Sequence, residues 1–94
     1  MQVRWLRTAL RNLDEEAAYI AADDPRAAHL VVERVLNAVE MLATHPSLGR
    51  PGRVPGTREL VVSNTRYLVP YRVRCQAVEV LRVFHTSRRP PQRW

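Results

Sequence analysis

The sequence contains no run of apolar residues longer than six, only one cysteine and only three histidines. A transmembrane helix needs about 20 consecutive apolar residues, so none is expected, and the arginines that follow Met1 argue against a secretory signal peptide. Cys75 has no partner for an internal disulfide, which predicts a reducing, cytoplasmic location without membrane attachment. One cysteine and three scattered histidines do not make a structural zinc site, and we expect neither a metal nor another cofactor.

Lysine is absent as well, because all fifteen basic residues are arginine. Residues 1–47 carry five arginines and seven acids, a net charge of −2, whereas residues 48–94 carry ten arginines and two acids, a net charge of +8. A GC-rich genome accounts for arginine in place of lysine but not for this segregation. The basic C-terminal half therefore predicts an anionic partner, either nucleic acid or an acidic protein segment.

The rest of the composition is that of a small folded domain. Of the 94 residues, 46% are apolar and 26% are charged, which is too apolar for a disordered chain. The length fits one domain over residues 1–94. A domain of this size buries only roughly 60–65% of the surface that its unfolded chain exposes, so we expect low stability without a partner.

In the first half, apolar residues recur with the period of a helix. A short strand is expected over residues 3–6, followed by Thr8 as the N-cap of a helix that stops near Asp23. The apolar stripe of this helix recurs at spacings of four and three, at Leu6, Leu10, Leu13, Ala17 and Ile20.

A second helix follows at once. Asp24 is suited to cap it, with Pro25 at its first position, and His45 before Pro46 ends it. Its inward stripe has the same spacing, at Ala28, Val32, Val35, Val39 and Leu42. The tight connection between the helices predicts an antiparallel helical hairpin.

The second half changes to the period of strands. All three glycines lie in residues 47–56, which predicts a loop. Strands are expected at residues 58–62, 67–74 and 77–84, and the short turns between them favour an antiparallel meander. Pro70 in the second of these strands indicates an edge or a bulge.

These elements define the expected fold. It is an α+β fold of the order β-α-α-β-β-β, with the helical hairpin packed on one face of a small, mainly antiparallel sheet. Residues 87–94, which are rich in proline and arginine, are expected to form an irregular tail.

Several short segments occur in a familiar order. In the first half they are Val3-Arg4-Trp5, Tyr19-Ile20-Ala21 and His45-Pro46. In the second half they are Gly56-Thr57-Arg58-Glu59-Leu60, Tyr67-Leu68-Val69-Pro70-Tyr71 and Val80-Leu81-Arg82-Val83-Phe84-His85. Over nearly the whole chain, their order and spacing resemble the RelE/ParE superfamily of bacterial toxins from type II toxin–antitoxin modules.

The resemblance implies one of two activities. RelE-like members are ribosome-dependent mRNA endonucleases, whereas ParE-like members poison DNA gyrase and are not known to use a nuclease site. RelE-like nucleases carry an arginine just before the Val-Tyr of the third strand, and the corresponding position here is Leu68. Residues 81–85 and 56–60 also look more like the ParE branch. The resemblance therefore implies a gyrase inhibitor, neutralised by a cognate ParD-like antitoxin with which it forms a hetero-oligomer.

The two activities imply different site residues. For a gyrase inhibitor, the arginines at and beyond the last strand would bind the target; these are Arg82, Arg88 and Arg89. For a nuclease that cuts mRNA on the ribosome, cleavage without a metal needs a base, an acid and cations for the phosphate charge. The candidates are Glu59 as base, His85, and the phosphate-binding arginines Arg58, Arg66, Arg88 and Arg89.

Ordinary structural roles stay open for two of these residues. Glu59 is also a natural salt-bridge partner of a neighbouring arginine, and His85 could bond a backbone group at the end of a strand. A third hypothesis for the whole chain is a basic nucleic-acid-binding module without toxicity.

Overall fold

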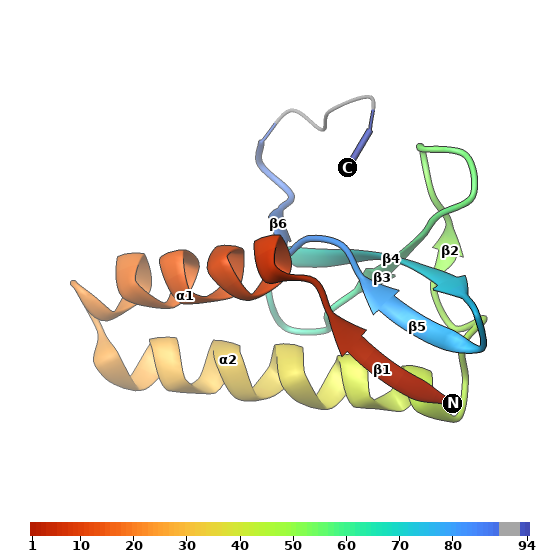
Figure 1. The fold of residues 1–94 in the computed structure, drawn as a ribbon. Helices are drawn as coiled ribbons and strands as arrows, with labels where there is room; N and C mark the ends of the chain where they lie inside the picture. The colour runs from red at the N-terminus through yellow and green to blue at the C-terminus, as the bar shows by residue number, and fades with distance from the viewer. Residues whose placement is uncertain (89–92) are drawn as a thin grey trace.

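The computed structural model describes residues 1–88 and 93–94. In this part of the chain, two helices lie side by side and cover one face of a six-stranded sheet (Figure 1). The helices are α1 (Arg7–Ala21) and α2 (Pro25–Glu40). The strands are β1 (Gln2–Trp5), β2 (Arg50–Pro51), β3 (Arg58–Val61), β4 (Tyr67–Arg74), β5 (Ala77–Val80) and β6 (Phe84–His85). The predicted α+β fold, with a helical hairpin on one sheet face, is confirmed.

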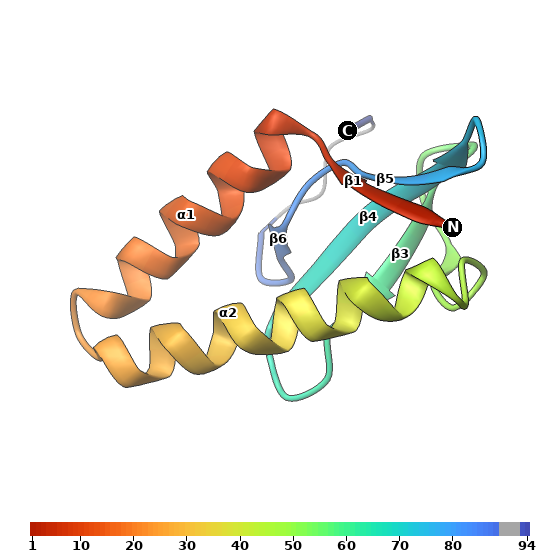
Figure 2. The same cartoon turned by 60° about the horizontal axis from the view of Figure 1, so that its bottom comes forward.

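The strands follow the order β1-β5-β4-β3-β2, and β6 pairs with β4. Antiparallel pairing of β3 with β4 and of β4 with β5 confirms the predicted meander. β1 is parallel to β5, with Gln2 opposite Ala77 and Trp5 opposite Val80. The N-terminal strand therefore lies beside a strand from the C-terminal half, and the helical hairpin makes the connection back across the sheet (Figure 2).

The core lies between the helical hairpin and the sheet. From α2 and the 3₁₀ turn that follows it, Val35, Val39 and Leu42 are buried as predicted. From β4, alternate residues reach the same core; they are Tyr67, Val69 and Tyr71. This alternation places Leu68, Pro70 and Arg72 on the opposite face of the sheet.

The inward stripe of α1 differs from the prediction. Leu10 is 46% exposed, and the buried residues of this helix are Ala9, Leu13 and Glu16. The helix begins at Arg7 after Leu6 rather than after Thr8, and no side chain among the described residues caps it. The small Ala9 lets the helix approach the core closely, which turns Leu10 outward. Glu16 is tolerated among these buried residues because its carboxylate has a hydrogen-bond partner and an ion-pair partner.

The start of α2 is as predicted, but its end is not. The side chain of Asp24 accepts a hydrogen bond from the Ala27 N–H at 3.1 Å, which satisfies one of the free donors of the first turn. The α-helix stops at Glu40, and residues Met41–Ala43 form a 3₁₀ turn, so the helical segment ends before His45.

The last predicted strand, residues 77–84, is two strands. Residues 81–83 separate β5 from β6, and the break lies beside Pro70. The Pro70 carbonyl accepts a hydrogen bond from the Leu81 N–H at 2.9 Å. In an antiparallel ladder a residue uses both its N–H and its C=O to bond the same residue of the neighbouring strand, but proline has no N–H to donate. The pairing is therefore interrupted at Pro70, which lies in an inner strand and not at a sheet edge.

The predicted loop 47–56 contains the short strand β2, and two buried side chains hold it. The Tyr71 hydroxyl donates to the Pro46 carbonyl at 2.7 Å and accepts from the Gly49 N–H at 2.8 Å. Glu59, which is almost fully buried, accepts from the Arg53 N–H at 3.1 Å and from Arg50 Nη2 at 3.3 Å. The strand expected to end at residue 62 ends at Val61.

Candidate functional site

A cavity of about 430 Å³ opens where α1 and α2 meet the start of β4 and the strand β6. One side of it is apolar and is formed by Tyr19, Ile20 and Val31 of the helices. The other side is polar and comes from Glu16 and from the C-terminal half of the chain; these residues are Thr65, Arg66, Tyr67, His85, Ser87 and Arg88. The cavity therefore combines an apolar wall with cationic and hydroxyl groups.

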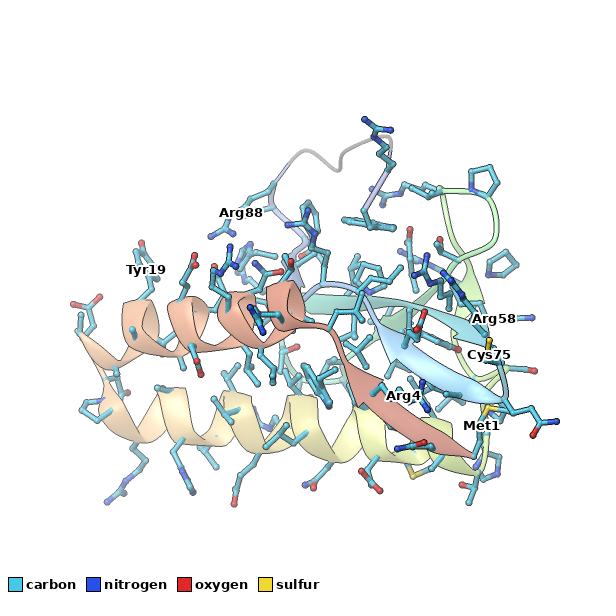
Figure 3. The ribbon with its side chains drawn as sticks, in the orientation of Figure 1. Met1, Arg4, Tyr19, Arg58, Cys75 and Arg88 are labelled. Carbon is cyan, nitrogen blue, oxygen red and sulfur yellow. The ribbon has the colours of Figure 1, made fainter. Side chains whose placement is uncertain are left out.

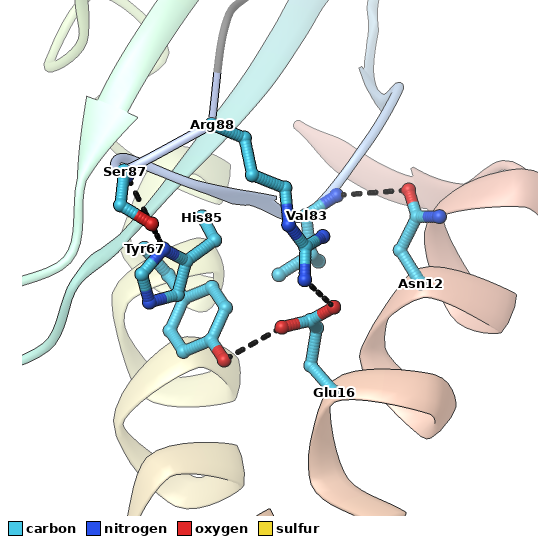
Figure 4. A network of polar contacts seen from close by, with 7 residues as sticks. All are labelled: Asn12, Glu16, Tyr67, Val83, His85, Ser87 and Arg88. Atoms are coloured by element: carbon cyan, nitrogen blue, oxygen red, sulfur yellow. Dashed lines mark hydrogen bonds and ion pairs between the residues drawn. The ribbon is translucent and has the colours of Figure 1, made fainter. Parts of the chain in front are cut away.

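Glu16 is the centre of a polar network in this cavity (Figure 4). Its carboxylate accepts a hydrogen bond from the Tyr67 hydroxyl at 2.8 Å and forms an ion pair with Arg88 Nη2 at 3.0 Å. Burial, followed by the hydrogen bond to Glu16 and the charge of Glu16, raises the pKa of Tyr67 to about 12. The phenol thus stays protonated and acts as a donor that holds the carboxylate.

His85 lies against Tyr67 with the two rings edge to face and their centroids 5.1 Å apart. Its Nδ1 accepts a hydrogen bond from the Ser87 N–H at 3.2 Å and lies 2.6 Å from the Ser87 hydroxyl. A backbone N–H can only donate, so Nδ1 is the acceptor and the neutral ring carries its proton on Nε2. His85 therefore bonds a backbone group at the end of its strand and keeps one ring nitrogen for another partner.

Three of the nuclease candidates line this cavity, and the expected base does not. Arg66, His85 and Arg88 are brought together, whereas Glu59 lies on β3 opposite Pro70. Tyr67, the residue opposite His85, is three positions from Pro70 on β4, so Glu59 and His85 lie on opposite faces of the sheet. The carboxylate that does reach the cavity is Glu16.

Two of the three arginines expected to bind a target, Arg82 and Arg88, line a second hollow of about 330 Å³. Arg88 thus belongs to the rim of both cavities. Arg82 donates to the Trp94 carbonyl oxygen through Nε at 3.3 Å and through Nη2 at 3.0 Å. Arg89, with the rest of residues 89–92 of the expected tail, lies outside the described residues.

Sequence reasoning missed Glu16, Tyr67 and Ser87 as members of the cavity. For Glu16 a signal exists: Ala9, Leu13, Glu16 and Ile20 recur at spacings of four, three and four, so a glutamate interrupts an otherwise apolar stripe. A charged residue on an inward stripe needs a partner. Nothing in the sequence indicates that the partners are Tyr67 and Arg88, more than 50 residues away.

A third hollow, of about 360 Å³, runs between α2 and the outer edge of β3. Its lining includes three apolar side chains that are each about half exposed, Met41, Leu48 and Val61. In the described part of the chain, β2 pairs only with Arg58 and Glu59, so the edge of β3 near Val61 has no strand beside it. We call this hollow the edge groove.

Within residues 1–88 and 93–94, no three His, Cys, Asp or Glu side chains gather where they could hold a metal ion. Neither α1 nor α2 has the length and apolar character that crossing a bilayer requires.

The chain is similar to known proteins over almost all of its length. The family model described as "ParE toxin of type II toxin-antitoxin system, parDE" matches residues 3–90. A curated protein of Sinorhizobium fredii named "Putative toxin Y4kP" is 50% identical over 91 residues, which cover 97% of this chain and 94% of that protein. A solved structure described as "Chromosomal ParDE TA system from P. aeruginosa" matches with a TM-score of 0.80 and 28% identity, over 90% of this chain and 95% of the other.

Proposed function

Because the chain belongs to the ParE toxin family of type II toxin–antitoxin systems, we propose that it arrests growth by inhibiting DNA gyrase and that a cognate antitoxin neutralises it. The proposal includes a cytoplasmic location, where gyrase acts on the chromosome. It assigns no bond-breaking step to the toxin itself.

The observation that carries the choice of gyrase over mRNA is at Leu68. This residue occupies the position at which RelE-like nucleases carry an arginine, and its side chain is only 2% exposed. It lies on β4 between Val61 and Phe84 of the neighbouring strands. A buried apolar side chain offers no charge to a phosphate, so a cation on which RelE-like cleavage depends is missing.

The surroundings of Glu59 agree with this choice. A general base must have its carboxylate within reach of the proton that it removes. Glu59 is buried and bonded to Arg50 and to the backbone of Arg53. Its contacts support a structural role in holding the 50–57 segment.

The edge groove supports a protein partner such as the antitoxin. Exposed apolar side chains that gather in one hollow mark interaction sites, and an open strand edge can accept an extended segment. We expect Val61→Glu to weaken neutralisation by the antitoxin while toxicity remains. Val73→Glu is the matched control, because Val73 is similarly exposed but lies on β4 outside the groove.

One observation favours a second candidate, the ribosome-dependent endoribonuclease. The cavity brings the titratable His85 together with two cations, Arg66 and Arg88. If these groups cleave RNA, His85→Ala should lower the cleavage rate by about 10²–10⁴-fold, the usual contribution of an acid or base. His29→Ala serves as the control, because His29 lies on the exposed surface of α2.

The test of the proposed function is the order in which synthesis stops after the gene is induced. Incorporation of labelled thymidine and of labelled methionine is followed in the same culture, for the wild type, His85→Ala and His29→Ala. We expect DNA synthesis to fall first in all three strains. Protein synthesis that falls first, with transcript cuts that disappear in His85→Ala, would contradict the gyrase proposal. Cells that grow normally would favour the third hypothesis, a non-toxic nucleic-acid-binding module.

A further inference from the structure

A row of charged residues crosses the face of the sheet that the helices leave open. Arg4 on β1, Glu79 on β5 and Arg72 on β4 are direct neighbours across the three strands. Arg74 follows two positions after Arg72 on the same face. The residues that alternate with them, Val3, Trp5, Val78 and Val80, pack into the core on the helix side. We call Arg4, Arg72, Arg74 and Glu79 the sheet-face cluster.

The sheet-face cluster has an excess of positive charge. Glu79 accepts a hydrogen bond from Arg72 Nε at 2.7 Å. This hydrogen bond, with the charges of Arg72, Arg74 and Arg4, lowers the pKa of the Glu79 carboxyl. All three arginines therefore act on one carboxylate, and two positive charges remain uncompensated. Figure 3 labels Arg4 at the sheet end of the molecule.

The spacing of the arginines suits an extended polyanion. Arg72 and Arg74 are about 7 Å apart along their strand, and Arg4 lies two strands from Arg72, or about 10 Å. A chain of phosphates suits this spacing, because it presents charges at regular intervals.

The distribution of exposed apolar residues favours a nucleic acid over a protein ligand. Protein interfaces are organised around buried apolar or aromatic anchors, whereas binding to phosphates needs only cations. Near this end of the sheet, the exposed large apolar side chains among the described residues are Met1 and Val73. The amino group of Met1 is bonded to the Ala43 carbonyl on the helix side, and Val73 alternates with the arginines, so it points to the helix face.

We propose that the sheet-face cluster binds the phosphodiester backbone of DNA. The source of this DNA rests on the proposed function: it is the duplex on which gyrase acts, so the toxin contacts the DNA as well as the enzyme. This surface is separate from the cavity of His85 and Arg88 and from the edge groove. The binding itself does not depend on gyrase and can be measured without it.

The experiment measures binding of the purified full-length protein to a labelled 30-base-pair duplex by fluorescence anisotropy over a series of NaCl concentrations. The variant Arg4→Gln/Arg74→Gln removes two charges from the face. The variant Arg11→Gln/Arg26→Gln removes two charges from the exposed helix surface and has the same net charge. Circular dichroism and thermal melting verify that each variant is folded.

We expect the sheet-face double variant to bind about tenfold more weakly or worse, and its salt dependence to fall by about two in log–log slope, because each lost phosphate contact lowers the slope by about one. The helix double variant should stay close to the wild type. Glu79→Gln should bind more tightly than the wild type, because it frees Arg72 and removes the repulsion of a carboxylate. No unfolded variant would show this increase.

Several results would overturn the proposal. They are absence of duplex binding by the wild type at low salt, equal losses in the two double variants, and weaker binding by Glu79→Gln. A single-stranded DNA and an RNA of the same sequence are measured in parallel, and a tenfold preference for RNA would exclude DNA as the ligand. Binding of labelled polyglutamate without any duplex binding would identify an acidic protein segment instead.

The outcome for gyrase is read separately. If the sheet-face double variant loses DNA binding but inhibits gyrase like the wild type, the DNA contact plays no part in inhibition, while the proposed function stands. If the wild type binds DNA but does not inhibit gyrase, the proposed function fails and the DNA-binding face remains.

Discussion

At the scale of single residues, the network of Glu16, Tyr67 and Arg88 joins the two halves of the chain. Glu16 belongs to the acidic N-terminal half, and its two partners come from the basic C-terminal half. A buried carboxylate without partners would oppose folding. The contacts therefore tie the start of β4 and the segment after β6 to helix α1, and they fix the polar wall of the cavity.

The raised pKa of Tyr67 makes the stability of the folded protein depend on pH in the alkaline range. The pKa of Tyr67 is about 12 in the folded protein and about 10 when unfolded. Between these values the folded state binds more protons than the unfolded state, so the stability falls as the pH rises from about 10 to 12. Thermal melting between pH 9 and 12 should show this loss in the wild type and a smaller loss in Tyr67→Phe. Tyr19→Phe, at an exposed position, is the control. Equal pH dependence in the wild type and Tyr67→Phe would contradict the assignment.

Gly49 is required by the close approach of Tyr71. A Cβ at position 49 would lie 2.6 Å from Cε1 of the Tyr71 ring and 2.9 Å from the Glu59 carbonyl oxygen. Because the ring is fully buried, we expect Gly49→Ala to cost about 1–3 kcal/mol of unfolding free energy, as overpacking does. Urea denaturation measures this loss. The comparison is Gly56→Ala, where the Cβ meets open space but φ is +83°. A Gly49→Ala protein as stable as the wild type would refute the close contact.

At the scale of elements, the helical hairpin and the meander could be predicted from the sequence, but their boundaries and facing could not. The stripe of α2 and the cap at Asp24 are local signals, and the structure agrees with both. For α1, two overlapping apolar stripes exist, and only the packing against the sheet decides that Leu10 is outside. The break between β5 and β6 depends on Pro70 in a neighbouring strand, so it is a property of the pairing rather than of residues 77–84.

The facing of α2 can be tested with two adjacent residues. Val35 is fully buried, whereas Leu36 is 43% exposed. Val35→Asp would bury an unpaired charge between helix and sheet, and we expect it to abolish folding. Leu36→Asp should fold and melt close to the wild type. Circular dichroism of the two variants measures this difference, and a folded, toxic Val35→Asp protein would show that the inward stripe is assigned wrongly.

The turn between β4 and β5 carries local strain. Cys75 and Gln76 both have positive φ, at +52° and +59°, as in the two-residue hairpin turns that favour Asn-Gly. A residue with a Cβ is disfavoured there by roughly 1 kcal/mol. We expect Gln76→Gly to raise the unfolding free energy by about 0.5–1 kcal/mol, measured by urea denaturation. A loss of stability would mean that the Gln76 side chain makes contacts that outweigh the strain.

At the scale of the whole molecule, the arginine-rich half of the sequence has a defined place in the fold. The basic second half of the chain supplies β2 to β6, so its arginines lie on the sheet and around the segment after it. The sequence already indicates an anionic partner, and Leu68 already indicates the ParE branch. It does not indicate that Arg4, from the acidic half, joins Arg72 and Arg74, because that placement follows from the parallel pairing of β1 with β5.

The proposal that the protein inhibits gyrase is tested most directly by incubating the purified toxin with DNA gyrase and a supercoiled plasmid, and measuring linear DNA after protein digestion. A toxin that stabilises the DNA-cleaved state of gyrase should produce linear plasmid in proportion to its concentration. None should form without gyrase, and the cognate antitoxin should suppress it. Plasmid that stays intact at toxin concentrations that arrest growth, while mRNA is cut in the presence of ribosomes, would contradict the proposal.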